Sequence, residues 1–254
     1  MNLPIGILRW FVERDRTRMK ISQAIYTSAN AELCRGYHLV SRSPGLDEQV
    51  AQSLCRWSPS HGCLSEDRAD AESLNFFQAS PDWFVLSRSV YGCPEFSQRG
   101  GLRLVTISLV FHASQLACYE NDVIACARIA LSTGLLMLPL TTPDRVPQID
   151  FPDRSQRPTG VSVDPSAIAD VLKTSRQVAL VGVDDPLAIL SGLFKNVEPL
   201  ERLKISFATG LKPSAQRPFR IQFFPSADRK QQNDLIRQGF SVRNCPHLAK
   251  VINC

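Results

Sequence analysis

The chain has 254 residues, 44% of them apolar and 21% charged, and this balance is typical of a soluble globular protein. No apolar run approaches the roughly 20 residues that a membrane-spanning helix needs, so we expect no membrane segment. The net charge of +5 lies at the two ends, because residues 1–20 carry +3 and residues 229–254 carry +4, which leaves −2 for residues 21–228. Nucleic-acid-binding proteins usually present one coherent basic face, so this distribution argues against nucleic acid as the main partner.

The chain contains eight cysteines but no convincing secretory signal. The apolar stretch from Leu3 to Val12 is interrupted by Arg9 and has neither a basic segment before it nor a small-residue cleavage site after it. Without export the cysteines stay reduced, so we expect a cytoplasmic protein whose thiols are buried or incidental. A regular pattern begins only after Met19, and we interpret residues 1–19 as a disordered or non-native extension from an upstream start codon.

The first regular segments are two short strands and a helix. Residues 20–28 and 36–42 alternate between apolar and polar side chains, as strands with one covered face do. A turn follows at Ser43–Gly45. Residues 47–57 then begin with an aspartate in the N-cap position and have apolar residues at every fourth position, which predicts an amphipathic helix. The polar stretch 58–73 is predicted to be a loop.

The strongest local signal is a long β-hairpin, with strands at residues 83–91 and 102–111. Apolar side chains occupy one whole face of the second strand from Val105 onward, and the other face is mixed, so this strand should be central or well covered. The connecting residues 92–101 contain glycines and a proline and are too many for a tight turn. Loops of this kind, carried by rigid strands, are where binding groups usually lie.

Helical periodicity follows from Leu116 to Thr133, and Pro139 ends it. Residues 141–160 contain four prolines and no periodicity, which indicates a linker or a surface excursion. The second half has an α/β rhythm, in which helices opened by Asp-Pro pairs alternate with apolar strands. The Asp-Pro pairs are Asp164-Pro165 and Asp185-Pro186, the strands are residues 177–183, 203–209 and 218–224, and a last polar helix spans 227–237.

Together these elements predict an α+β fold. We expect a mixed sheet with a central antiparallel hairpin, helices packed on the sheet, and a more α/β-like second half. The predicted organisation is an extension at residues 1–19, a strand-rich half at 20–140, a linker or excursion at 141–160, and a second half at 161–254 that packs on the first as one domain.

No catalytic constellation rises above background, so we name no catalytic residue, no metal site and no cofactor. The strand-to-helix turn at Val183–Pro186 has two aspartates and no lysine, which suits helix capping and repels phosphate. Two groups of cysteine and histidine lack the paired spacing that makes a zinc site recognisable. These groups are Cys55, His61 and Cys63, and Cys245, His247 and Cys254.

A cysteine nucleophile is an alternative that the sequence leaves open. Such an enzyme needs a thiolate beside an imidazole, and the local pairs are Cys34 with His38 and Cys93 with His112. Cys93 is the more interesting because its loop is near two arginines, although an incidental thiol is the simpler explanation. Contact of the two basic ends with nucleic acid is a further alternative, which predicts a steep dependence on salt.

We expect a partner-binding surface around the hairpin loop and the turn before the first helix. Arginine forks recognise carboxylates and phosphates well, although an exposed ion pair with Glu95 explains part of the same pattern. The predicted partner-binding residues are Arg88, Glu95, Arg99, Gly100, Ser43, Pro44 and Gly45.

Several segments, taken in their order along the chain, resemble a bacterial domain known as the GTPase-associated protein N-terminal domain, type 2. The start of that domain is similar to QAIYTS and GYHLVSRSPGL, which precede an amphipathic helix here. Its central hairpin is similar to FVLSRSVYGCPEFSQRGGLRLVTISLVF, in which the pair Arg99-Gly100 precedes the second strand. Its closing strand pair is similar to LERLKISFATGLKPSAQRPFRIQFFP, so the resemblance covers most of residues 20–225.

The resemblance implies an adaptor or regulatory module of NTP-dependent conflict systems, which are defence-like and encode such proteins beside small GTPases. It implies a physical or functional pairing with a nearby GTPase and a link from target sensing to an effector, and it carries over no catalytic residue. Proteins with this domain are usually much longer, so we expect a stand-alone version or a fragment. The sequence leaves the partner's identity, any small ligand and the oligomeric state open.

Overall fold

The computed structural model describes residues 19–31, 34–95, 101–139, 141, 143–152, 170–172 and 174–245. The interpretation of residues 1–18, the helix start at Asp164-Pro165 and the loop residues 96–100 lie outside these ranges. None of the helices in the described ranges is both long and apolar enough to span a lipid bilayer.

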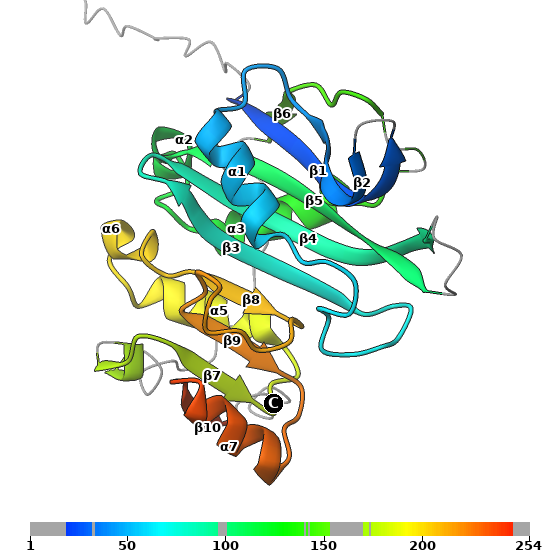
Figure 1. Ribbon diagram of the computed structural model, residues 1–254. Coiled ribbons are helices and arrows are strands. Elements are labelled where there is room, and N and C mark those ends of the chain that lie inside the picture. Colours follow the sequence, from blue (N-terminus) through cyan, green and yellow to red (C-terminus); the bar gives the residue numbers. More distant parts are fainter. Residues whose placement is uncertain are drawn as a thin grey trace, which may run out of the picture.

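The described strands form one ten-stranded mixed sheet in the order β10-β7-β9-β8-β3-β4-β5-β1-β2, with β6 pairing beside β2 on β1 (Figure 1). Neighbours from β3 to β2 are antiparallel, whereas β8, β9, β7 and β10 are parallel to one another. The α+β fold with a central antiparallel hairpin is confirmed. The strands are β1 (Met19–Ala31), β2 (Cys34–Arg42), β3 (Glu72–Ser80), β4 (Trp83–Pro94), β5 (Leu102–His112), β6 (Ile149–Phe151), β7 (Val178–Val181), β8 (Phe207–Thr209), β9 (Ile221–Phe224) and β10 (Ser241–Asn244).

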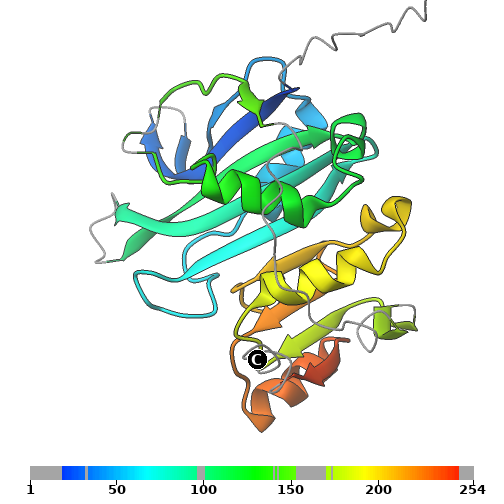
Figure 2. The same cartoon turned by 180° about the vertical axis from the view of Figure 1, so that it is seen from behind.

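Helices cover both faces of this sheet and make a three-layer structure. One face carries α1 and α7, seen in front in Figure 1, and the other carries α3 and α5, seen in front in Figure 2. The α3 and α5 face holds the larger core, which draws apolar side chains from both halves of the chain. The helices are α1 (Glu48–Trp57), α2 (Ala113–Ala117), α3 (Val123–Ser132), α5 (Pro186–Lys195), α6 (Pro199–Arg202) and α7 (Arg229–Arg237).

The predicted hairpin is the pair β4 and β5, whose register runs from Trp83 opposite His112 to Tyr91 opposite Leu104. All β5 residues from Leu104 to Phe111 are buried, as the apolar pattern predicted. The neighbouring strand β3 was not predicted as a strand, and that omission is the main error in the first half. Residues 73–77 of β3 are buried on both faces, so the period-two alternation that marks a half-covered strand is weak there.

The continuous helix predicted from Leu116 to Thr133 is wrong, because the chain forms two shorter helices, α2 and α3. Glu120 and Asn121, which lie between these two helices, have φ angles of 55° and 56°. A left-handed pair of this kind cannot continue an α-helix. Asp122 then restarts the chain by capping α3, since its carboxylate accepts hydrogen bonds from the amides of Ile124 and Ala125 at 3.1 and 3.0 Å.

The stretch predicted as a linker contains β6, which pairs with the first residues of β1. Phe151 of β6 packs edge-on against Phe111 and Tyr119, with ring centroids 5.2 and 5.6 Å away. This part of the segment therefore belongs to the sheet and to the larger core. The edge strand β10 was also not predicted, because it is only four residues long and its side chains are half-exposed or exposed.

The capping signals of the second half are confirmed where they can be seen. Asp185 caps α5 through a hydrogen bond from the Ala188 amide at 3.0 Å, and Pro186 occupies the first helical turn. The four residues of β7 are all buried, because α5 covers one face of the strand and α7 covers the other. Gly239, with φ of 93°, follows the end of α7.

A short antiparallel seam joins the two halves of the sheet. In this seam β3 pairs with β8 at Asn75 opposite Ala208 and at Phe76 opposite Phe207. The backbone just beyond β8 approaches β3 so closely that a Cβ atom on Gly210 would lie 2.2 Å from the carbonyl oxygen of Glu72. Gly210 also has a φ of 66°, so both its space and its conformation require glycine.

Replacing Gly210 by alanine should therefore destabilise the protein by about 3 kcal/mol, the upper end of ordinary single substitutions, because the seam must open to admit the methyl group. Gly239→Ala is the matched control, since Gly239 has φ of 93° but nothing within 4 Å of its Cβ position. It should cost only the left-handed conformation, about 1 kcal/mol. Urea unfolding followed by circular dichroism measures both, and equal costs would contradict the proposed close contact.

Candidate functional site

The outer edge of β1 changes partner at Ser43. Residues 24–31 of β1 pair with β2, and residues 19–21 of β1 pair with β6. The Ser43 hydroxyl accepts a hydrogen bond from the Gln23 amide at 2.8 Å, and the Ser43 amide donates to the Gln23 carbonyl at 2.9 Å. The Ser43 hydroxyl and the Gln23 side-chain amide both donate to the carbonyl of Pro147 at 2.9 Å. This set of bonds, the Ser43 node, ends β2 and fixes the chain that enters β6.

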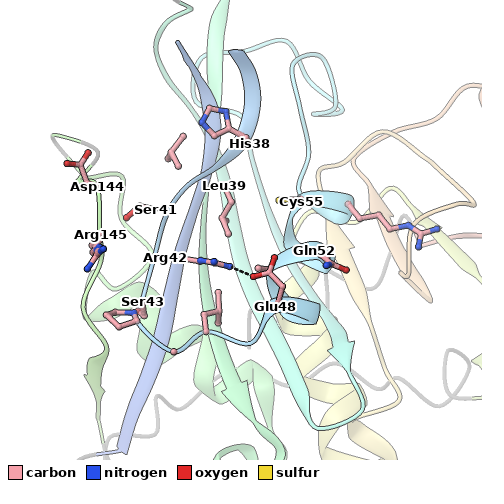
Figure 3. Close-up of a pocket in the computed structure, with 16 residues that line it drawn as sticks. His38, Leu39, Ser41, Arg42, Ser43, Glu48, Gln52, Cys55, Asp144 and Arg145 are labelled. Atoms are coloured by element: carbon pink, nitrogen blue, oxygen red, sulfur yellow. Dashed lines mark hydrogen bonds and ion pairs between the residues drawn. The ribbon is translucent and has the colours of Figure 1, made fainter. Parts of the chain in front are cut away.

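A groove of about 1030 Å³ lies along β2, between α1 on one side and residues 144–145 on the other (Figure 3). The predicted turn Ser43, Pro44 and Gly45 forms one end of its lining. The remaining lining residues are His38, Leu39, Val40, Ser41, Arg42, Leu46, Glu48, Ala51, Gln52, Cys55, Arg56, Asp144 and Arg145. We call this feature the β2 groove.

A bulge in β2 decides which side chains face α1. The register places Ile25 opposite Ser41 but the next residue of β1 opposite Leu39, so one residue of β2 is extra. This insertion brings Arg42 onto the same face as Leu39, because residues around a bulge no longer alternate strictly. Arg42 then reaches α1 and donates to the Glu48 carboxylate at 2.9 Å (Figure 3).

The outer edge of β2 has no strand beside it among the described residues. The Gln23 amide and carbonyl both point toward β2, and main-chain groups alternate along a strand. The register therefore directs the main-chain groups of Arg35, Tyr37, Leu39 and Arg42 outward, away from β1. Within the described chain, this edge is available for pairing.

Ser41 also lines the groove, although the register places it on the opposite face of β2 from Leu39 and Arg42. Its side chain is 3% exposed, and its hydroxyl has no hydrogen-bond partner among the described residues. Buried hydroxyl groups are normally satisfied, so Ser41 is an exception among the residues that line the groove.

Arg88, one of the predicted binding residues, belongs to the opposite face of the sheet. Its guanidinium donates to the Glu72 carboxylate at 2.8 Å and to the carbonyl of Leu136 at 3.2 Å. The Arg88 side chain is only 19% exposed. Arg88 thus joins β3 to the end of the α3 region, and the structure does not bring it to the turn at Ser43–Gly45.

Glu95 lies on the α1 face, near the free edge, rather than beside Arg88. Its amide donates to the carbonyl of Gly101 at 2.9 Å, and its carboxylate is beside the Tyr37 hydroxyl. Burial and this carboxylate raise the pKa of Tyr37 to about 12, so the phenol stays neutral and accepts a hydrogen bond from the Leu104 amide at 2.9 Å. Arg99 and Gly100 lie outside the described residues, and their role stays a prediction.

The pairs considered for cysteine catalysis are not assembled in the described chain. His112 pairs with Trp83, and Cys93 lies ten residues further along β4, roughly 30 Å away at the usual rise per strand residue. The side chain of Cys34 lies outside the described residues. No group of three histidine, cysteine, aspartate or glutamate residues in the described ranges is close enough to hold a metal ion.

Among the cysteines whose side chains the structure describes, Cys63 is the one whose pKa its surroundings lower, and sequence reasoning did not single it out as reactive. Burial raises the pKa of the Cys63 thiol, but the guanidinium of Arg217 and hydrogen bonds from Ser60 outweigh it and hold the pKa below its ordinary value. Arg217 is distant in sequence, so only the folded structure brings the cation to the thiol.

Residues 20–135 match the family model described as GTPase-associated protein 1, N-terminal domain type 2. The family predicted from the sequence is therefore confirmed for this segment, which runs from β1 past α3 and contains every residue of the β2 groove except Asp144 and Arg145. The similarity predicted for residues 200–225 lies beyond the match and stays a prediction. No curated protein and no solved structure matches the chain.

The Ser43 node can be tested by removing one hydroxyl group. Ser43→Ala should cost about 2 kcal/mol, because it leaves the Gln23 amide and the Pro147 carbonyl with unmet hydrogen-bonding capacity in a site that is 1% exposed. Ser41→Ala, two residues away and equally buried, removes a hydroxyl that has no partner in the described chain and should cost less than about 0.5 kcal/mol. Urea denaturation compares the two, and a Ser41→Ala effect as large as that of Ser43→Ala would disprove the assignment.

The environment of Cys63 predicts a shifted alkylation profile. The rate of iodoacetamide alkylation of Cys63, followed peptide by peptide by mass spectrometry over a pH series, should reach half its maximum below the pKa of about 8.5 of a free cysteine. Arg217→Gln should move that midpoint upward, because the cation that stabilises the thiolate is lost. Lys212→Gln removes an exposed cation from the same loop and should leave it in place. If Arg217→Gln left the pH midpoint of alkylation unchanged, the cation would be too far from the thiol to act on it.

Proposed function

We propose that this chain is a non-enzymatic interaction module whose partner is a small GTPase. The family match supports association with a GTPase. The observation that carries the proposal is that the described part of the matched segment presents a strand edge with no neighbouring strand, lined by a groove. A free edge beside a groove is a feature that proteins use to bind other proteins.

The wider setting of the proposal is a bacterial conflict system, in which the module would act as an adaptor that pairs with a GTPase and links target sensing to an effector. The resemblance found in the sequence supports this setting. Cytoplasmic location is part of the same proposal. The free thiols of Cys55, Cys93 and Cys118 are exposed, and exposed free thiols persist best in a reducing compartment.

A GTPase encoded beside this chain should bind it directly. The two purified proteins, with the GTPase loaded either with GDP or with a non-hydrolysable GTP analogue, should co-elute in size-exclusion chromatography and give a measurable dissociation constant by isothermal titration calorimetry. The control is a GTPase of similar size from an unrelated gene neighbourhood, which should not bind. A correctly folded chain that binds its neighbour in neither nucleotide state would refute the proposed partner.

The non-enzymatic part of the proposal needs a separate measurement. Single-turnover GTP hydrolysis by the partner should proceed at the same rate with and without a saturating amount of this chain. An acceleration that depended on one arginine of this chain would identify a GTPase-activating role and overturn the adaptor assignment.

A further inference from the structure

We propose that the β2 groove binds an extended, acidic segment of the partner protein, which pairs with the outer edge of β2 and is held there by α1. This inference rests on the proposed function and names the surface that would perform it. The occupant is then an added strand beside β2, at the end of the sheet opposite β10.

The main chain of β2 supports strand addition. Arg35, Tyr37, Leu39 and Arg42 direct their main-chain groups away from β1, and no described segment pairs with them. Each end of this edge is defined, because Gly36 with φ of 98° lies near its start and the Ser43 node ends it. An incoming segment would gain hydrogen bonds that do not depend on its sequence.

Helix α1 supplies the wall against which side chains of the added segment would pack. Ala51, Gln52 and Cys55 of α1 line the groove together with Leu39 of β2, and Leu46 also belongs to the lining. A groove bounded by an edge strand and a helix is the arrangement in which several peptide-recognition domains bind their ligands as an extra strand. The strand provides affinity, and the helix-side contacts provide selectivity.

The charges at the groove favour an acidic occupant. The register places Arg35 and Arg42 on the α1 face near the two ends of the outer edge. The charged lining of the groove has an excess of cations, since Arg42, Arg56 and Arg145 outnumber the carboxylates of Glu48 and Asp144. Glu48 already engages Arg42, but that ion pair is exposed, with side chains 45% and 68% accessible, so an incoming carboxylate can share it at little cost.

The same charges argue against a second copy of this chain as the occupant. If two β2 strands paired antiparallel along residues 35–42, Arg35 of each copy would face Arg42 of the other. Like charges directly opposite each other destabilise a strand pair. Carboxylates at those two positions of a different protein would be stabilising instead.

One pair of variants on α1 tests occupation of the groove. Gln52→Trp places an indole in the groove from an exposed helix position and should weaken binding of the neighbouring GTPase at least tenfold, which is about 1.4 kcal/mol. Gln49→Trp is the matched control on the same helix, since Gln49 is exposed but does not line the groove, and it should bind as the unmodified chain does. Equal binding by both variants would overturn the proposal.

The charge requirement is tested by reversal. Arg35→Glu with Arg42→Glu should weaken binding by a further factor of ten or more, because it replaces attraction by repulsion at both ends of the edge. Arg237→Glu reverses a charge on the remote helix α7, where the side chain is 81% exposed, and should have no effect. Undiminished binding by the double variant would rule out an acidic occupant.

The native cysteines give a footprint without any substitution. Cys55 lines the groove, whereas Cys93 and Cys118 are exposed elsewhere. A bound partner should slow the alkylation of Cys55 and leave the other two rates unchanged. Protection of Cys93 instead would place the interface at the hairpin end and refute the groove.

A peptide-binding experiment tests the groove independently of the identity of the partner. The probe is a fluorescent ten-residue peptide of alternating threonine and glutamate, with the threonine-lysine peptide as its control. If the GTPase binds but ignores Gln52→Trp, the proposed function stands and the groove assignment fails. If the GTPase does not bind, binding of the acidic peptide that Gln52→Trp abolishes would support the groove alone, and its failure to bind would overturn it.

Discussion

The arrangement of the β2 edge depends on the transfer of β1 from one neighbour to another at Ser43. A single strand edge is shared, with β2 taking one part and β6 the other, and the two segments meet at the carbonyl of Pro147. If β2 continued past Ser43, β6 would have no place on β1 and Phe151 would lose its contacts with Phe111 and Tyr119. The same transfer stops β2 and places residues 144–145 across from α1. A few hydrogen bonds thus connect the main core to the walls of the groove.

The two faces of the sheet are packed differently, and the difference concerns the groove. On the α3 and α5 face, phenylalanine and leucine side chains fill a core that runs through both halves of the chain. On the α1 face, β4 and β5 present small hydroxyl side chains, for example Ser89 and Thr106, whose oxygens lie 2.8 Å apart. The apolar cluster on this face is smaller, and α1 contributes little more to it than Val50 and Leu54. The helix that forms the groove wall therefore rests on fewer apolar contacts than α3 or α5, and segments of that kind adjust most readily to a ligand.

The sequence was informative where structure is encoded locally. The long strands around Val105, the aspartate and proline at the start of α5, and the helix after the Ser43–Gly45 turn all follow from alternation, capping and periodicity. The break at Glu120 and Asn121 was not predicted, because neither residue is glycine. Strand β3 was not predicted, because its buried polar residues Ser73 and Asn75 interrupt the apolar run by which a strand covered on both faces is recognised.

In the candidate site, too, locally encoded features could be predicted and features that depend on strand pairing could not. The turn Ser43–Gly45 could be found from sequence, since its residues punctuate a strand. The ion pair of Arg88 could not be anticipated, because its partner Glu72 lies on β3, the strand that was missed. The bulge that turns Arg42 toward α1 is a property of pairing between two strands and leaves no mark in the sequence of either one. A binding surface made from a strand edge depends on which strands are absent from that edge, and this is a property of the whole sheet.

The family match ends at residue 135, but the physical unit does not. Strand β3 pairs with β8, and Phe76 packs against Phe207 with ring centroids 6.0 Å apart, so a chain cut after α3 would expose an apolar strand edge. It would also lose β6 and with it the partner that holds Ser43 in place. The parallel half completes the core on which β1 and β2 lie, while the groove itself comes almost entirely from the matched segment. Binding measurements therefore require the complete chain, because the residues that would contact the partner are positioned by residues that lie outside the family match.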